Sequence, residues 1–243
     1  MANIKLEHVT YKYLSKEYEV LALDDLSAEI ENEKINVIIG ESGCGKTTLA
    51  KAILGLIECD GDIYFNDKNV NLLSAKKRNC SYVNQEIALY PHLTIFANIA
   101  FPLQFMKLQE TEIRKRVNDV AEKFNIQYCL SRLPRDVSLG QAQRAVIAKA
   151  LVKQSDIYVF DEPFSGLDKI NKELIIENIK ELVKVTHSTV IFITHDVKEA
   201  LFFADNIYVM KEGKIILSGE KNVIFNTQDS YIKGLFSNEK DSV

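Results

Sequence analysis

An eight-residue motif of the form G-x-x-x-x-G-K-[ST] is the part of the sequence that most directly indicates chemistry. Its residues are Gly40, Glu41, Ser42, Gly43, Cys44, Gly45, Lys46 and Thr47. A loop of this kind, between a strand and a helix, wraps its backbone N–H groups around phosphate oxygens at the helix N-terminus. We expect Lys46 to reach the β- and γ-phosphates of a nucleotide and the Thr47 hydroxyl to bind Mg²⁺, with Thr48 completing the nucleotide-binding set.

Two adjacent carboxylates, Asp161 and Glu162, follow the apolar run 157–160 and begin 115 residues after Lys46. An acid at the end of a buried strand can hold the coordination shell of Mg²⁺, and a second acid can orient or deprotonate an attacking water. We assign the metal role to Asp161 and the water role to Glu162. Together with the phosphate loop, this pair predicts phosphoryl transfer to water.

The elements that must position these residues alternate between strands and helices. Apolar, β-branched runs predict strands buried on both faces at 35–39, 157–160 and 189–194. Helices are expected at 46–56, closed near Gly55, and at 172–184. Such alternation is typical of parallel βαβ units.

Weaker patterns lie outside these units. They predict a half-buried strand at 4–9, an edge strand at 61–66, a hairpin formed by 207–210 and 214–217, and a short polar tail from residue 221. Between residues 95 and 150 the apolar spacing is helical, with no strong strand signal.

We therefore predict a single α/β domain over residues 1–243. Its P-loop NTPase core has an antiparallel N-terminal β region and is built from residues 1–85 and 155–243. An inserted α-helical subdomain occupies about 86–154.

The composition excludes disordered, collagen-like and low-complexity proteins. Of 243 residues, 30 are Lys or Arg, 34 are Asp or Glu and 47% are hydrophobic, as in an ordinary globular domain. The net charge of −4 argues against a nucleic-acid partner. We expect no signal peptide and no membrane span, and the spacing of the four cysteines favours reduced, intracellular thiols.

Further motifs complete a series that resembles the ATP-binding cassette (ABC) ATPase family over nearly the whole chain. They are Gln85, which matches the Q-loop glutamine; Val137–Arg144, at the place of the signature sequence; Ser165-Gly166-Leu167-Asp168, similar to the D-loop; and Thr194-His195-Asp196, similar to the switch-histidine segment. Tyr13 is placed like the aromatic residue that stacks on adenine, and Tyr11 is the less favoured candidate.

The resemblance implies Mg²⁺-dependent ATP hydrolysis by a head-to-tail pair of ABC ATPase subunits, identical or different. Each ATP would lie between one chain's phosphate loop and the other chain's signature residues, here Ser138, Leu139, Gly140 and Gln141. His195 would be catalytic and bond the γ-phosphate within its own chain. Gln85 would join Thr47 and Asp161 around Mg²⁺, and Asp168 would lie in the D-loop.

Leu139 departs from the family pattern, because the signature is usually Leu-Ser-Gly-Gly-Gln and its first glycine is replaced here. One hypothesis is that the leucine side chain crowds the nucleotide or restricts φ, which weakens the contact with the partner chain's ATP. The alternative is that Leu139 points aside and only its backbone N–H matters.

The segment 88–103 resembles import-type cassettes that energise the uptake of sugars and other small solutes. It follows Gln85, where the family receives its membrane subunit, so we expect transmembrane permease partners and a location on the cytoplasmic face of the cell membrane. An extracytoplasmic solute-binding protein is a further candidate partner.

Sugar-type importer ATPases usually continue into a C-terminal β-rich domain, which argues here against a sugar. The solute itself cannot be derived from this chain. The alternatives are an export-type cassette, a soluble non-transport ABC ATPase and a weakly active ATP-binding regulatory subunit.

Overall fold

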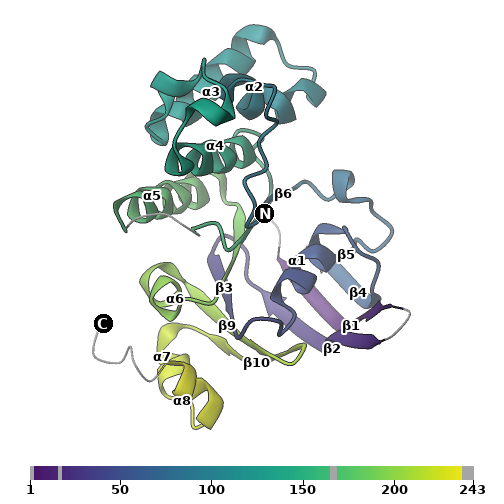
Figure 1. Ribbon diagram of the computed structural model, residues 1–243. Coiled ribbons are helices and arrows are strands. Elements are labelled where there is room, and N and C mark those ends of the chain that lie inside the picture. Colours follow the sequence, from purple (N-terminus) through teal and green to yellow (C-terminus); the bar gives the residue numbers. More distant parts are fainter. Residues whose placement is uncertain (1–2, 16–17, 165–168, 237–243) are drawn as a thin grey trace.

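The computed structural model describes residues 3–15, 18–164 and 169–236, which form two β-sheets, helices around them and a separate group of helices (Figure 1). The expected D-loop residue Asp168 lies outside these described residues. Among the described residues, no helix is long and apolar enough to cross a membrane.

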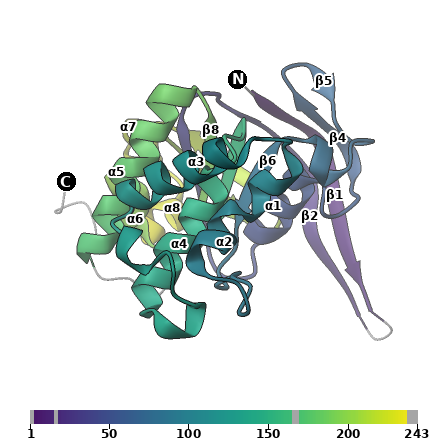
Figure 2. The same cartoon turned by 90° about the horizontal axis from the view of Figure 1, so that it is seen from above.

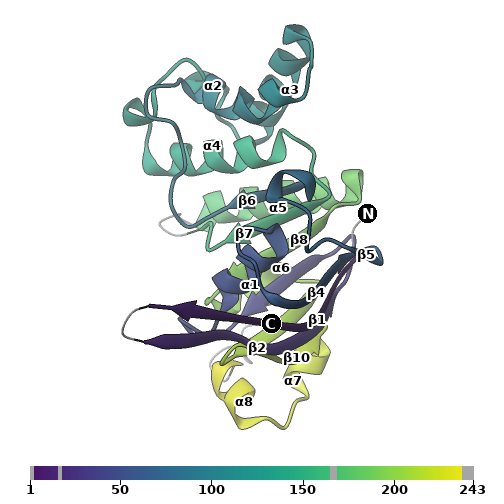
Figure 3. The same ribbon diagram turned by 90° about the vertical axis from the view of Figure 1, so that its right-hand side faces the viewer.

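The N-terminal sheet is antiparallel, in agreement with the prediction, and has the strand order β2-β1-β4-β5. Its strands are β1 (Ile4–Leu14), β2 (Glu19–Ile30), β4 (Asp60–Phe65) and β5 (Lys68–Asn69). The hairpin of β1 and β2 extends away from the rest of the molecule (Figures 2 and 3). The strand and turn expected at 61–66 are present as β4 and the residues after it, but the expected position of this strand at the sheet edge is wrong. Asn66 and Asp67 adopt positive φ values of 49° and 62°, so the chain reverses and β5 takes the edge.

The central sheet has the strand order β10-β9-β3-β8-β7-β6. Its strands are β3 (Ile35–Ile39), β6 (Cys80–Val83), β7 (Ile157–Asp161), β8 (Thr189–Thr194), β9 (Asn206–Lys211) and β10 (Lys214–Gly219). All pairs are parallel except the hairpin of β9 and β10. The carboxyl ends of β3, β7 and β8 therefore meet at one edge, where ligands of open α/β sheets bind.

Alternate residues of the central strands enter two hydrophobic cores. Val37 packs in one core with residues of α5 (Lys169–Thr186) and α6 (Val197–Phe203), whereas Ile38 packs in the other. The second core lies between the two sheets and contains most of the buried side chains of α1 (Lys46–Leu54). This helix ends at Gly55 with φ +70°, as predicted. Both faces of the strands that carry the site are therefore covered.

The region between β6 and β7 is helical, as its apolar spacing predicted. Its main helices are α2 (Ile95–Ala100), α3 (Glu110–Lys123) and α4 (Leu139–Leu151), with short 3-10 turns between them. The three helices lie together at one end of the molecule, away from the β1–β2 hairpin (Figures 1 and 3). The subdomain limits of about 86–154 remain a prediction.

The expected polar tail after residue 221 is wrong. The chain forms α7 (Lys221–Phe225) and α8 (Ser230–Phe236), and their Ile224, Ile232 and Phe236 side chains are buried in the first core. Phe225, Tyr231 and Leu235 also pack against this core. The two helices have only 5 and 7 residues, which is too short for a clear periodic signal in the sequence.

Candidate functional site

The phosphate-loop motif forms a tight turn between β3 and α1. Gly43 and Gly45 adopt left-handed φ values of +82° and +108°, which L side chains rarely take. A Cβ atom at Gly45 would also overlap the carbonyl oxygen of Ala22. Conformation therefore requires glycine at both positions, and lack of space requires it at Gly45 as well.

The Lys46 side chain lies along the inside of this loop. Its Nζ atom donates hydrogen bonds to the carbonyl oxygens of Gly40 and Glu41, both at 2.8 Å, and the residue is only 6% exposed. Thr47, the next residue, is exposed. A buried ammonium and the N-terminal amides of α1 therefore converge where an anion would bind.

The loop is supported from behind by the β9–β10 turn. The backbone N–H of Gly213 donates to the Cys44 carbonyl at 3.0 Å, and a Cβ atom at Gly40 would overlap the Met210 carbonyl. Burial raises the pKa of the Cys44 thiol, so this cysteine stays protonated and structural.

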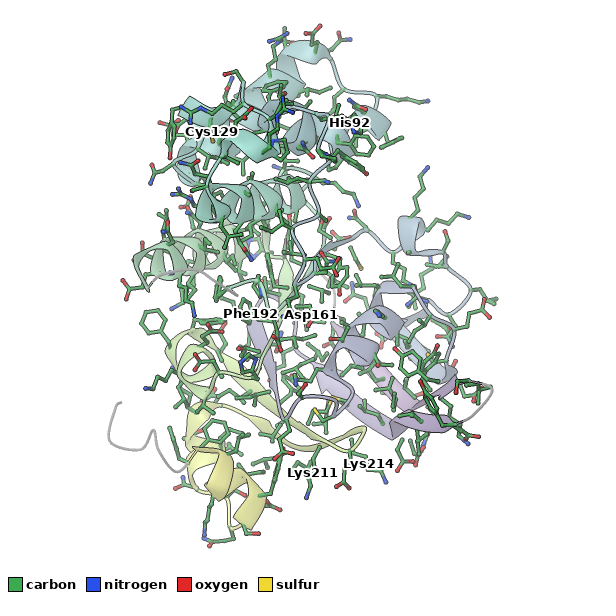
Figure 4. The ribbon with its side chains drawn as sticks, viewed as in Figure 1. His92, Cys129, Asp161, Phe192, Lys211 and Lys214 are labelled. Carbon is green, nitrogen blue, oxygen red and sulfur yellow. The ribbon has the colours of Figure 1, made fainter. Side chains whose placement is uncertain are left out.

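Asp161 lies at the end of β7, near the middle of the molecule (Figure 4). It is 5% exposed, and its Oδ2 atom accepts a hydrogen bond from the Tyr82 hydroxyl at 3.1 Å. Burial raises the pKa of Asp161, although hydrogen bonds from Thr47 and Tyr82 oppose that shift. The structure thus brings two of the three expected metal ligands, Thr47 and Asp161, into contact.

Glu162 and His195 meet at the ends of two neighbouring strands, β7 and β8. Glu162 Oε1 lies 3.1 Å from His195 Nδ1, and the Glu162 N–H donates to the Ile193 carbonyl at 3.0 Å. Glu162 has a left-handed φ of 49°, a conformation that several other non-glycine residues of the described chain also adopt. The histidine side chain is largely exposed, so its ring is accessible to a ligand.

Tyr13 reaches the same helix N-terminus from the β1–β2 hairpin. Its hydroxyl is 3.2 Å from Thr48 Oγ1, and its ring is exposed, whereas Tyr11 packs against the second core. The two rings make an edge contact with centroids 4.9 Å apart. This geometry favours Tyr13 over Tyr11 as an aromatic platform beside the phosphate loop.

Ser138 caps the N-terminus of α4. Its hydroxyl accepts from the Gln141 N–H at 3.3 Å, and Gln141 Oε1 accepts from the Ser138 N–H at 2.9 Å, which forms a capping box. Leu139 is the first helical residue and is 58% exposed. Residue 139 has ordinary helical backbone, which leucine adopts without strain, so the structure gives no support to a restriction of φ, and the weakened contact stays a prediction.

The predicted site residues fall into two groups. Lys46, Thr47, Asp161, Glu162 and His195 gather at the carboxyl edge of the central sheet, whereas the signature residues Ser138–Gln141 belong to the helical group (Figure 1). Gln85 is exposed in the connection from β6 to α2.

Two contacts around the site have no counterpart among the residues expected from the sequence. The first involves Tyr82, in β6, whose hydroxyl donates a hydrogen bond to Asp161. Glu199, in α6, bonds Thr194 just before His195. A clear signal for either was lacking, because both contacts depend on how the elements pack.

Comparisons with known proteins agree with this geometry. The profile of the family described as ABC transporter matches residues 23–165. The oligosaccharides import ATP-binding protein MsmX of Bacillus subtilis (strain 168) is 38% identical over 238 residues, which cover 97% of this chain and 64% of MsmX. The molybdate/tungstate import ATP-binding protein WtpC of Pyrococcus horikoshii is 37% identical over 218 residues, covering 89% of this chain and 63% of WtpC. This chain thus covers less than two thirds of the length of each.

Solved structures show the same fold. The dimeric, post-hydrolysis ATP-binding cassette MJ0796 bound to ADP and Pi matches with a TM-score of 0.82 and 28% identity over 89% of this chain and 98% of that chain. CbiO1 of Clostridium perfringens, part of the ABC transporter complex cbiONQ, matches with a TM-score of 0.81 and 28% identity over 98% and 92%. These similarities confirm the predicted α/β fold class with its N-terminal antiparallel sheet.

Proposed function

The chain belongs to the ABC transporter family, and we propose on this basis that it binds and hydrolyses ATP with Mg²⁺ to drive solute transport through membrane subunits. The observation that carries the proposal is the convergence of Lys46, Asp161 and the Glu162–His195 pair at one sheet edge. Phosphoryl transfer needs mainly positioning and charge stabilisation, and these residues supply both.

Binding of the nucleotide is assigned to the loop and its surroundings. The N–H groups of residues 40–48 and the Lys46 ammonium would hold the phosphates, exchanging the lysine's present carbonyl partners for phosphate oxygens. Tyr13 would stack on the adenine from the hairpin side, where its ring is exposed.

A Mg²⁺ ion fits the oxygen ligands at this edge. Magnesium in nucleotide sites uses one or two protein oxygens beside phosphates and waters, and Thr47 and Asp161 are already in contact. The buried Asp161 carboxylate, whose pKa burial raises, favours a nearby cation. Gln85 is proposed as a further ligand. When bound, the ion neutralises charge that develops on the phosphates.

Glu162 is proposed to orient and deprotonate the attacking water, and His195 to bond the γ-phosphate. The 3.1 Å contact between their side chains supports a concerted placement of the two groups.

A complete site is proposed to need a second ABC ATPase subunit. In the chain itself, Ser138–Gln141 belong to the helical group (Figure 1), whereas the phosphate loop lies between the carboxyl end of β3 and α1. A head-to-tail partner would bring its signature residues to this chain's ATP, and the dimeric state of the similar cassette MJ0796 supports this arrangement. The N-terminus of α4, capped by Ser138, would then face phosphate.

Import through permease subunits is the proposed transport direction, and the names of MsmX and WtpC support it. Within 88–103, Ile95, Ile99 and Leu103 fill the helical core, while Tyr90 and Phe101 form an aromatic cluster with Phe105. The Phe105 side chain is exposed, so this cluster offers a docking surface. Docking would place the chain at the cytoplasmic face of the membrane, with a solute-binding protein on the other side.

Nucleotide affinity tests the enzymatic part of the proposal. Lys46→Ala should abolish detectable ATP binding and Mg²⁺-dependent hydrolysis, because the buried ammonium is lost. Lys51→Ala, on the last turn of the same helix, is the matched control and should retain both. If the wild-type chain hydrolyses no ATP, either alone or with its membrane partners, the proposed activity is contradicted.

Co-purification tests the transport part. Tagged chain should retain integral membrane proteins after mild solubilisation, and Phe105→Asp should release them. Val185→Asp introduces the same charge at an exposed apolar residue in α5 and should not. Equal retention by both variants would argue against docking at the aromatic cluster.

A further inference from the structure

Glu199 holds the turn that carries His195. Its Oε2 atom accepts a hydrogen bond from the Thr194 hydroxyl at 2.7 Å, and its Oε1 atom accepts one from Lys172 Nζ at 2.7 Å. Thr194 ends β8 directly before His195, whereas Lys172 lies in α5. The Glu199 carboxylate therefore connects α6 with β8 and α5 next to His195.

The Thr194 side chain passes this constraint to the backbone on the other side of His195. Its Oγ1 atom accepts a hydrogen bond from the Asp196 N–H at 3.0 Å, and Asp196 in turn caps the N-terminus of α6. His195 therefore lies between Thr194 and Asp196, which are hydrogen-bonded to each other. Its backbone is held on both sides while its ring contacts Glu162.

Burial distinguishes the Lys172–Glu199 ion pair from an ordinary surface pair. Its side chains are 28% and 14% exposed, whereas the Lys123–Glu181 pair, also involving α5, has the same 2.7 Å separation but exposures of 49% and 56%. Solvent screens the exposed pair more strongly, and removing one partner of a buried pair leaves a poorly solvated charge. The Lys172–Glu199 contact is therefore the one expected to restrain structure.

We propose that Glu199 and Lys172 are positioning residues that set the His195 ring for ATP hydrolysis. The inference rests on the proposed function, because it assigns the network a part in that same reaction. Loss of the network would loosen the turn at His195 and its contact with Glu162. The phosphate loop, which is held by β2 and the β9–β10 turn, would still bind nucleotide.

Steady-state kinetics and nucleotide binding together test this role. Lys172→Met and Glu199→Gln should each lower kcat about 10- to 100-fold, as expected when a reacting group is misplaced. The Kd for ATP should change less than about twofold, since kcat and binding depend on different parts of the site. The kcat of the double variant should be no lower than that of the more damaging single variant, because both substitutions break the same Lys172–Glu199 ion pair.

Two matched variants separate positioning from general destabilisation. Lys172→Arg keeps the charge and should retain most of the wild-type kcat, whereas Lys123→Met removes the exposed pair and should leave kcat unchanged. Unchanged kcat in Lys172→Met and Glu199→Gln would overturn the proposal. Equal losses of kcat and ATP affinity, or the same loss in Lys123→Met, would also overturn it.

The imidazole NMR signals of His195 provide a readout that does not depend on hydrolysis. The chain has four histidines, so the signal is identified by its loss in His195→Gln. Lys172→Met should shift or broaden this signal, and Lys123→Met should not. An unmoved signal would overturn the positioning role even if the chain hydrolyses ATP, and a chain that does not hydrolyse ATP would contradict the proposed function alone.

Discussion

Glu162 Oε1 lies 3.1 Å from His195 Nδ1, and the two residues follow the carboxyl ends of adjacent parallel strands. The sheet itself sets this distance, because Asp161 pairs with Ile193 in register and the Glu162 N–H bonds the Ile193 carbonyl. Two residues that follow different strands thereby lie in contact with each other.

Replacing Glu162 with glutamine should separate ATP binding from ATP hydrolysis. The amide keeps the size of the side chain but cannot take a proton from water, so kcat should fall at least about 100-fold while the Kd for ATP stays within about threefold. Single-turnover hydrolysis and equilibrium binding measure the two effects. Ordinary turnover in Glu162→Gln would show that another group activates the water.

Asp161→Asn should stabilise the nucleotide-free protein at neutral pH while abolishing hydrolysis. Burial raises the pKa of Asp161 above its ordinary value of 3.8, so the folded protein binds this proton more tightly than the unfolded chain. The stability conferred by the protonated form is therefore present below pH 3.8 and is lost as the pH rises through the raised pKa.

Thermal unfolding at several pH values checks the direction of this pH dependence of stability. The midpoint of Asp161→Asn should exceed that of the wild type at pH 7, and the difference should shrink toward pH 4. Asp119→Asn, at an exposed position of α3, is the control and should follow the wild type. A neutral-pH midpoint below the wild type would show that hydrogen bonds to the carboxylate outweigh its burial.

Sequence patterns predicted the central strands well where both faces are buried. The runs that became β3, β7 and β8 are continuous and apolar because helices or the other sheet cover each face. The strand β6 gave no such signal, since three of its four residues are only partly buried at the end of the sheet. Exposure at a sheet edge removes the hydrophobic requirement on which such a prediction depends.

The part of the candidate site that the sequence predicts is the part whose backbone conformation depends only on neighbouring residues. The phosphate loop needs glycine at 43 and 45 whatever surrounds it, so its motif is visible in the sequence. The network of Glu199 instead depends on the packing of α5 against α6, which brings Lys172 to a residue 27 positions away. No spacing of residues in a single sequence predicts such a contact.

Arg78→Met should destabilise the protein through the helix that carries the phosphate loop. The Arg78 guanidinium is buried and donates to the carbonyls of Ala52 and Ile53, both at 2.8 Å, at the C-terminal end of α1. The Ala52 carbonyl keeps a hydrogen bond from the Gly55 N–H at 3.0 Å, but loss of the guanidinium donor to both carbonyls should still cost about 1–3 kcal/mol in the free energy of unfolding, measured with urea. Arg114→Met removes an exposed ion pair of α3 and should cost less than about 1 kcal/mol. Equal costs for the two variants would show that Arg78 does not restrain α1.

Leu139→Gly should increase ATP turnover if the leucine side chain crowds a nucleotide held by the partner chain. Leu139 is exposed on the first turn of α4, beside the Ser138 cap that is proposed to face phosphate. A shorter side chain would let the α4 N-terminus approach more closely, and we expect kcat of the assembled ATPase to rise about threefold or more, equivalent to about 0.7 kcal/mol or more of barrier.

Leu139→Ala separates the steric cause from a backbone cause. Both variants remove the isobutyl group, but only glycine adds backbone freedom and weakens the first turn of the helix by up to about 1 kcal/mol. Because residue 139 is helical, alanine should raise kcat at least as much as glycine. If neither variant raises turnover, the side chain points away from the nucleotide and only its N–H matters, which is the alternative left open by the sequence.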